Sequence, residues 1–306
     1  MSALFLGLDG GGSWARAAVL DADARPCGRA AVRGASVAGG GAEQALAALA
    51  GAAHLALRGL DAEAVAGCVA GLAGYRALAE PAEFAERCRA AFGIPVPVRL
   101  CSDAVPAFAA GSTATAGTVL IAGTGAVCCR VADGRVTHYG GGFGWLLGDE
   151  GSGFWLGRAA VRRALDEPTG PLAAAVLRHC GAAGPVELLH WVYDGPPRRL
   201  AELAPLVGAA AEAGDPAAGA IVAEAAEHLA ALVRATAQDG PLVLAGSVAA
   251  AAGPVRARLL ALLADPRTGV AGPLHTAGDA ALAAARLAMT PPPGADDPAV
   301  RSPELS

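Results

Sequence analysis

The sequence predicts an α/β fold of two related lobes, because one pattern of strands, glycine turns and helices begins twice. The first copy starts with an apolar run at Leu4 that ends in Asp9–Gly10–Gly11–Gly12–Ser13 and leads into a second apolar run. The second copy starts at Thr118 and passes through Gly123–Thr124–Gly125 into another apolar run. Each unit is typical of a strand hairpin whose glycine tip leaves backbone N–H groups open to a ligand. We therefore expect duplicated βββαβαβα lobes that point their turns at a shared cleft.

The other elements of the first lobe follow in the order expected for a layered α/β domain. They are a strand at 28–32, a glycine-rich loop at 36–41, a helix at 42–57, a strand at 65–72, a helix at 81–92, a strand at 96–100 and a helix at 104–110.

The second lobe is expected to contain more helices than the first. After its hairpin come a strand at 136–139, helices at 158–166, 171–180, 187–191, 200–213 and 217–236, a strand at 241–245 and helices at 254–263 and 275–289. We divide the chain into an N-terminal lobe at 1–113, a C-terminal lobe at 114–289 and a tail at 290–306. The last helix is a candidate for packing back on the first lobe, and the tail, rich in Pro and Asp, is expected to be disordered.

Composition limits the class of protein. Of 306 residues, 54% are hydrophobic and 17% charged, which favours large buried cores. The net charge is −5 and no arginine-rich block occurs, so we expect neither nucleic acid nor an anionic membrane as a partner. The first apolar run has no basic segment before it, and charges interrupt the alanine-rich runs, so we expect no signal peptide and no membrane span. Seven cysteines without a CxxC pair favour free thiols and a cytoplasmic location.

Five short motifs occur in a fixed order: LDGGGS, SDA, AGTG, GGFGWLLGDEGSGFWLG and VLAGSV. In this order the sequence resembles the N-acetylglucosamine kinases and the BadF/BadG/BcrA/BcrD-type ATPases that activate benzoyl-CoA reductase. Both belong to the actin-like, or ribonuclease H-like, ATPase and sugar kinase superfamily. The resemblance runs through residues 4–289 and implies a two-lobed fold with ATP and a sugar in the cleft between the lobes. It leaves a homodimer open.

The two glycine turns are the expected phosphate site. Their N–H groups suit phosphate oxygens, with the Ser13 and Thr124 hydroxyls as added donors. A Walker A signature is absent. The resemblance places Mg²⁺ at Asp9, through water; the structural alternative is that Asp9 only caps the turn. It also implies adenosine contacts, which we place at Ala201, Gly246 and Ser247.

Asp103 lies where a strand ends and a helix begins, the position at which open α/β sheets present reactive groups. The resemblance implies that this carboxylate is the base for the sugar hydroxyl that attacks the γ-phosphate. The alternative is that Asp103 caps the following helix, a task for which Ser102 competes.

The acceptor is expected to contact the glycine–aromatic segment and the loops facing it. Asp149 matches the family's sugar position, while Glu150 binds sugar or braces the loop, and Trp145 and Trp155 favour packing over stacking. The expected acceptor contacts are Ser36, Ala73, Gly74, Asp103, Gly142, Phe143, Gly144, Asp149 and Glu150.

Two departures from the kinase pattern concern the acceptor. The family's asparagine is missing near Ser36, where Val37 or Ala38 takes its place, and Ala126 and Val127 follow the second glycine turn where an asparagine is usual. The sequence and the resemblance therefore predict an ATP- and Mg²⁺-dependent kinase for an amino sugar such as N-acetylglucosamine or glucosamine, and the resemblance implies O6 as the hydroxyl that is phosphorylated. A different acceptor, an ATPase that activates a reductase or dehydratase, and a silent sugar sensor are the alternatives.

Overall fold

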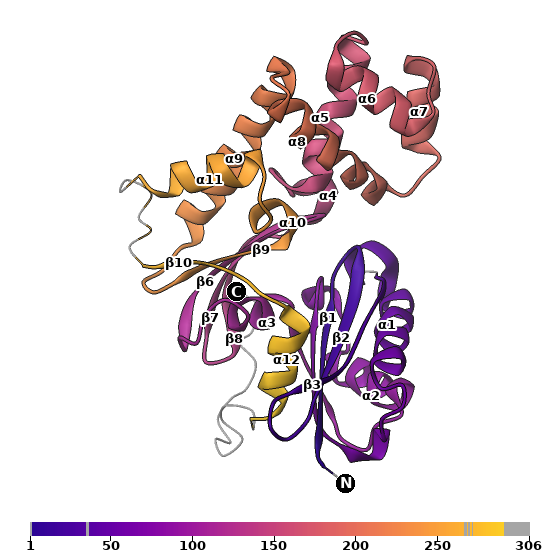
Figure 1. Ribbon diagram of the computed structural model, residues 1–306, viewed down its shortest axis with the longest axis vertical. Coiled ribbons are helices and arrows are strands. Elements are labelled where there is room, and N and C mark those ends of the chain that lie inside the picture. Colours follow the sequence, from indigo (N-terminus) through magenta and orange to yellow (C-terminus); the bar gives the residue numbers. More distant parts are fainter. Residues whose placement is uncertain (1, 35–36, 266–267, 269, 271, 291–306) are drawn as a thin grey trace.

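Two five-stranded sheets with the same strand order form the framework of the protein (Figure 1). The structure, a computed structural model, describes residues 2–34, 37–265, 268, 270 and 272–290. The first sheet has the order β3-β2-β1-β4-β5 and the second the order β8-β7-β6-β9-β10. In each, three antiparallel strands are extended by two parallel ones. The strands are β1 Leu4–Gly10, β2 Trp14–Leu20, β3 Pro26–Arg33, β4 Val65–Leu72, β5 Val98–Ser102, β6 Ala116–Ala122, β7 Ala126–Ala132, β8 Arg135–Gly141, β9 Leu242–Ala245 and β10 Leu274–Thr276.

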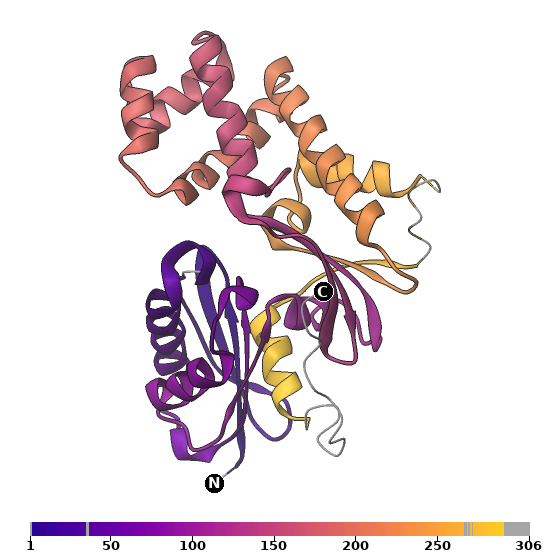
Figure 2. The same cartoon turned by 180° about the vertical axis from the view of Figure 1, so that it is seen from behind.

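Helices cover both faces of the first sheet. The even-numbered residues of β1, such as Leu6 and Leu8, are fully buried in the core shared with α1 (Val37–Ala56) and α2 (Pro81–Phe92). The opposite face receives α12 (Ala280–Ala288), which follows the second sheet in sequence but packs on β1, β2 and β4 (Figures 1 and 2). The first sheet is therefore completed by the last helix among the described residues.

Glycines allow α12 to lie directly on the sheet. A Cβ atom on Gly7 would lie 2.1 Å from the Ala285 backbone nitrogen and 2.2 Å from the Ala281 carbonyl oxygen. Gly67 has the same role near the helix end, where its Cβ would lie 2.4 Å from the Ala288 oxygen. Because backbone cannot yield as a flexible side chain does, these positions exclude any side chain.

Both ends of α12 are also bonded to the first lobe. Asp279 caps the helix by accepting from the backbone N–H groups of Ala281 and Leu282, and its second oxygen lies 3.2 Å from an Arg29 nitrogen. At the other end, the Arg99 guanidinium donates to the carbonyl oxygens of Leu287 and Thr290.

The second lobe carries a helical layer that the first lobe does not have. Its helices lie between β8 and β9 or follow β9, and their apolar faces share one core with β6, β7 and β9 (Figure 2). Within the described residues, α9 is long and apolar enough for a membrane span, and 44% of that window is buried. The elements are α4 Gly144–Leu147, α5 Gly153–Asp166, α6 Pro171–Cys180, α7 Pro185–Tyr193, the 3₁₀ helix η3 Pro197–Leu203, α8 Ala204–Glu212, α9 Pro216–Thr236, α10 Gly246–Ala249 and α11 Pro254–Leu263.

The short helix α3 (Ala104–Ala109) joins the two sheets. It follows β5 of the first sheet, yet Ala107 and Phe108 pack in a small core with residues of the second. The segment at 277–279 leads from β10 back to α12 on the first sheet. It crosses at the same place, where the Gly278 N–H donates to the Ala110 carbonyl oxygen at 2.9 Å. Both chain crossings between the lobes therefore meet beside α3.

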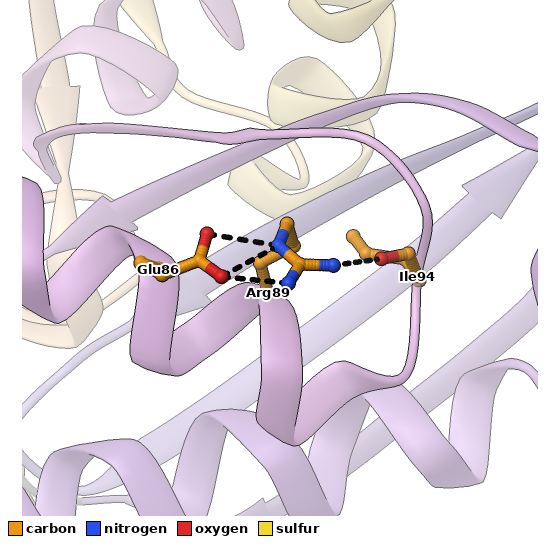
Figure 3. A network of polar contacts seen from close by, with 3 residues as sticks. All are labelled: Glu86, Arg89 and Ile94. Atoms are coloured by element: carbon orange, nitrogen blue, oxygen red, sulfur yellow. Dashed lines mark hydrogen bonds and ion pairs between the residues drawn. The ribbon is translucent and has the colours of Figure 1, made fainter.

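A surface network fixes the turn from α2 into β5 (Figure 3). The Arg89 guanidinium donates to both carboxylate oxygens of Glu86 at 2.6–3.0 Å and to the Ile94 carbonyl oxygen at 3.3 Å. Gly93 ends the helix with a left-handed φ of 67°. These contacts set the direction of the chain toward the strand that ends at Ser102.

Several element boundaries differ from the sequence expectations; the expected helix at 200–213, for example, is the 3₁₀ helix η3 followed by α8. In the expected loop at 36–41, a short helical stretch begins at Val37, and Gly41, with a non-helical φ of 80°, separates it from the expected helix, which follows and ends at Ala56. The glycine–aromatic segment contains α4, and α5 begins at Gly153, five residues earlier than expected. Residues 274–276 form β10, where we expected a helix to begin; pairing with β9 outweighs their local preference. The tail at 291–306 lies outside the described residues.

Candidate active site

A cleft between the two sheets collects the predicted site residues. Most of them line it, including Asp9, Asp103, Asp149 and both glycine turns. Gly10 and Glu150 do not line it, and Ser36 lies outside the described residues. The remaining predicted residues along the cleft are Ala73, Gly74, Gly142, Phe143, Gly144, Ala201, Gly246 and Ser247.

The two glycine turns meet across the cleft. The Ser13 and Thr124 hydroxyl oxygens are 2.7 Å apart although the residues are 111 positions apart in the chain. A Cβ on Gly12 would have Thr124 as its nearest neighbour, at 3.7 Å. The two hydroxyls predicted to contact phosphate therefore converge on one point, while the N–H groups of Gly11 and Gly123 donate within their own hairpins, to the Trp14 and Gly125 carbonyl oxygens at 2.9 Å.

Each glycine turn is hydrogen-bonded to neighbouring loops of its own lobe. In the first turn, the Gly10 and Ser13 carbonyl oxygens accept from the backbone N–H groups of Ala73 and Gly34, at 2.8 and 2.9 Å. In the second turn, the Gly123 oxygen accepts from the Gly153 N–H at 2.7 Å. With their carbonyls held in this way, the turns keep a fixed shape.

Asp9 ends β1 at the floor of the cleft. Its carboxylate has one weak ion pair, with Arg16 at 3.5 Å, and no hydrogen bond of the described residues joins it to the N–H groups of its own turn. Turn capping is therefore not what holds this side chain. A carboxylate that lines the cleft and has one weak ion pair suits Mg²⁺, an ion that keeps waters and takes few protein ligands.

Asp103 lies at the junction of β5 and α3, close to β4, because Gly71 has no side chain. A Cβ there would lie 3.2 Å from the Asp103 Cα and 2.5 Å from the Pro106 ring. The Asp103 side chain makes no capping hydrogen bond; the Ser102 hydroxyl instead accepts from the Ala104 N–H at 3.3 Å. Ser102, rather than Asp103, therefore bonds the free N–H at the start of α3. The Asp103 carboxyl lines the cleft.

The electrostatic surroundings of Asp103 disfavour its charge. Burial in low dielectric, followed by the nearby Asp9 carboxylate, raises its pKa to about 7, although the Ser102 hydroxyl opposes the shift. A carboxylate with a pKa near neutrality is suited to take a proton at physiological pH.

The glycine–aromatic segment forms the wall of the cleft opposite Ala73 and Gly74. Phe143 is 64% exposed and Trp145 is 45% exposed, and both line the cleft. We expected both tryptophans to pack in the core. Trp155 does so, since it is buried with its ring 5.2 Å from the His228 ring, whereas Trp145 is partly exposed. Glu150 is exposed and does not line the cleft.

The predicted adenosine residues adjoin the second phosphate turn. Gly246 has a φ of 83°, and a Cβ there would lie 2.4 Å from the Ala122 carbonyl oxygen, so only glycine fits. Ser247 follows it at the start of α10, and its N–H lies 3.8 Å from the Cβ position of Gly123. Ala201 lies in η3, on the far side of Gly153.

Among the side chains along the cleft that sequence reasoning did not identify, Arg76, Tyr139 and Asp279 lie close to the predicted carboxylates. The Arg76 guanidinium stacks 4.6 Å from the Tyr139 ring and so joins the two lobes beside Asp103. Asp279, the cap of α12, also lines the cleft; burial raises the pKa of Asp9, Arg16 opposes this shift, and the Asp279 charge adds a smaller increase. Of these, Asp279 had a sequence signal, since an aspartate before an alanine-rich run marks a helix start.

The sequence of this chain is similar to those of known proteins. A family model described as the BadF/BadG/BcrA/BcrD ATPase family matches residues 6–265. The N-acetyl-D-glucosamine kinase of Dictyostelium discoideum is 31% identical over 137 residues, which span 42% of this chain and 43% of that relative, less than half its length.

Solved structures match over nearly the whole chain. One from Chromobacterium violaceum, provisionally described as an N-acetylglucosamine kinase, has a TM-score of 0.70 and 27% identity, and the match covers 94% of this chain and 99% of that one. Another from Porphyromonas gingivalis, described in the same terms, has a TM-score of 0.75 with 20% identity over 93% and 98% of the two chains, a likeness in fold. The two-lobed actin-like fold is confirmed, and the chain belongs to the BadF/BadG/BcrA/BcrD ATPase family.

Proposed function

We propose that this protein is an ATP-dependent sugar kinase that phosphorylates a hydroxyl group, O6 in the first instance, of an amino sugar such as N-acetylglucosamine or glucosamine. The observation that carries the proposal is Asp103, a carboxyl with a pKa of about 7 in a cleft that also holds two converging glycine turns. Relatives described as N-acetylglucosamine kinases support the acceptor class. A cytoplasmic location belongs to the same proposal.

The proposed reaction assigns one task to each group. The Ser13 and Thr124 hydroxyls, with N–H groups of the turns other than those of Gly11 and Gly123, hold the β- and γ-phosphates of ATP. Asp103 accepts the proton of the sugar hydroxyl as its oxygen attacks the γ-phosphorus, and ADP leaves. Asp9 would hold Mg²⁺ through water, and the ion supplies charge neutralisation on the phosphates when bound.

The cysteines favour a kinase over an activator with a shared iron–sulfur cluster. Such clusters need thiolate ligands. Cys128 and Cys129 are both fully buried within β7, and burial raises the pKa of Cys128 to about 12. Cys180, at the end of α6, is half-buried, and burial raises its pKa to about 11.

An acceptor panel tests the proposal. ADP release with Mg²⁺-ATP should be stimulated by an amino sugar well above the rate with simple hexoses or with water alone. N-acetylglucosamine against glucosamine is the deciding pair, and ¹³C and ³¹P NMR of the product would establish whether O6 carries the phosphate. A protein that binds ATP but transfers to no sugar in the panel would contradict the kinase assignment.

The pH profile should report Asp103. Its carboxylate is the active form, so kcat/KM for the acceptor is expected to fall about tenfold per pH unit below pH 7 and to level off above it. The profile is measured with the best acceptor at saturating Mg²⁺-ATP, with the pH stability of the protein checked by circular dichroism. A flat profile between pH 5.5 and 8 would show that Asp103 is not the base.

A further inference from the structure

Asp149 has an unusual backbone conformation that its surroundings must maintain. Its φ is 65°, one of three positive values at non-glycine positions among the described residues, together with Ala24 and Asp133. The left-handed region costs free energy for residues with a side chain, although aspartate tolerates it better than most. Glycines at 148 and 151 were available nearby for such a bend, so a side chain at this position points to a role for the carboxylate.

The carboxylate of Asp149 is directed to the second phosphate turn. One oxygen, Oδ1, accepts from the Ala126 N–H at 3.0 Å, immediately after Gly123–Thr124–Gly125. All three carboxylate atoms lie 2.8–3.0 Å from the position that a Cβ on Gly125 would take. The carboxylate therefore packs against the turn, and glycine at 125 makes room for it.

The segment after Asp149 completes the support of the turn. The Gly153 N–H donates to the Gly123 carbonyl oxygen at 2.7 Å, and the Phe154 N–H donates to the Thr124 oxygen at 3.0 Å. The buried Ser152 is held in turn, because its N–H donates to the Asp149 carbonyl oxygen at 3.1 Å. Both backbone bonds come from α5, whose start depends on the conformation at Asp149.

We propose that Asp149 is a positioning residue for the second phosphate turn, so that its loss weakens nucleotide binding even when no acceptor is present. The inference rests on the proposed function only in assigning that turn to ATP phosphates. Because a carboxylate has several lone pairs and the Ala126 N–H uses one, Asp149 can also bind a sugar hydroxyl. The segment at 142–149, which is expected to contact the sugar, and the second phosphate turn are then joined by the hydrogen bond from Ala126 to Asp149.

The variants Asp149→Gly and Asp149→Asn distinguish the effect of the hydrogen bond to Ala126 on nucleotide binding from the effects of the carboxylate charge and of the backbone strain. Glycine adopts the same φ without a side chain, whereas asparagine keeps an oxygen for the Ala126 N–H but loses the charge. Asp133→Gly is the matched control. Asp133 also has a positive φ, of 48°, but is exposed in the turn between β7 and β8 and does not line the cleft.

Calorimetric titration with Mg²⁺ and AMPPNP, a non-hydrolysable ATP analogue, tests the inference without any acceptor. Asp149→Gly is expected to raise Kd about tenfold, the effect of losing a hydrogen bond to a charged group. Asp149→Asn should stay within about threefold of the unsubstituted protein, and Asp133→Gly should leave Kd unchanged. Circular dichroism verifies that each variant is folded.

Two results would overturn the inference. Unchanged AMPPNP binding by Asp149→Gly would leave Asp149 as an acceptor ligand only. Binding by Asp149→Asn as weak as that by Asp149→Gly would show that the hydrogen bond to Ala126 is not the cause. Failure of the unsubstituted protein to bind AMPPNP would instead contradict the proposed function, so the two failures are distinguishable.

Discussion

Replacing Asp103 by asparagine is expected to lower kcat with the best acceptor by about 10²- to 10⁴-fold, the usual contribution of a general base. Asparagine has nearly the same shape but does not accept the proton of the sugar hydroxyl. Since Asp103 lies outside both phosphate turns, the Kd for AMPPNP should change little. Coupled ADP release measures the first quantity and calorimetric titration the second. Turnover close to that of the unsubstituted protein would remove Asp103 from the mechanism.

The same variant should be more stable than the unsubstituted protein at alkaline pH. Burial raises the folded-state pKa of Asp103 from 3.8 to about 7, so the folded state holds a proton that the unfolded state has already lost. The free energy of unfolding therefore falls as pH rises from about 4 to about 7, and asparagine removes this loss. Asp103→Asn is expected to have a higher Tm at pH 8 and a similar one near pH 4. A lower Tm at pH 8 would indicate a structural role for the charge.

Replacing Gly7 by alanine is expected to destabilise the protein by about 3 kcal/mol, the upper part of the range for overpacking. The added methyl would lie 2.1 Å from the Ala285 nitrogen, and α12 would have to move off the sheet. Because Asp279 and the segment at 277–279 move with that helix, we also expect a loss of the proposed kinase activity. Urea unfolding followed by circular dichroism measures the stability.

Gly219→Ala is the matched control for Gly7→Ala. Gly219 lies in α9 with nothing within 4 Å of its Cβ position, so alanine there should be neutral or stabilise the protein by up to about 1 kcal/mol. If Gly7→Ala unfolded at the same urea concentration as Gly219→Ala, α12 would not be held as closely to β1 as the backbone positions require.

The fold was predictable because the repeated hairpins have strong local signals. Apolar runs interrupted by glycine turns identified β1, β2, β6 and β7, and the order of the later elements identified the duplication. The resemblance then indicated the two-lobed architecture, which the family match confirms. The strand β10 was not predictable, since three residues at 274–276 take their conformation from β9 rather than from their own preference.

The candidate site was predictable where a motif has a fixed spacing in sequence. Asp9, Asp103 and the two turns were placed in the cleft by their positions at strand ends, although their roles stay predictions. Arg76 and Tyr139 could not be placed, because their stacking joins elements of different lobes and neither belongs to a motif. The bond from Asp149 to Ala126 depends on a side-chain direction that spacing does not determine.

The packing of α12 on the first sheet has a consequence for synthesis of the chain. Residues 280–288 leave the ribosome after the other described elements of both lobes, so one face of the first sheet stays uncovered until both lobes have been made. N-terminal domains commonly fold first during synthesis, but this lobe lacks its covering helix until α12 has been made. A fragment that stops after residue 113 would expose that face to water, and the two lobes are therefore expected to mature together rather than in sequence.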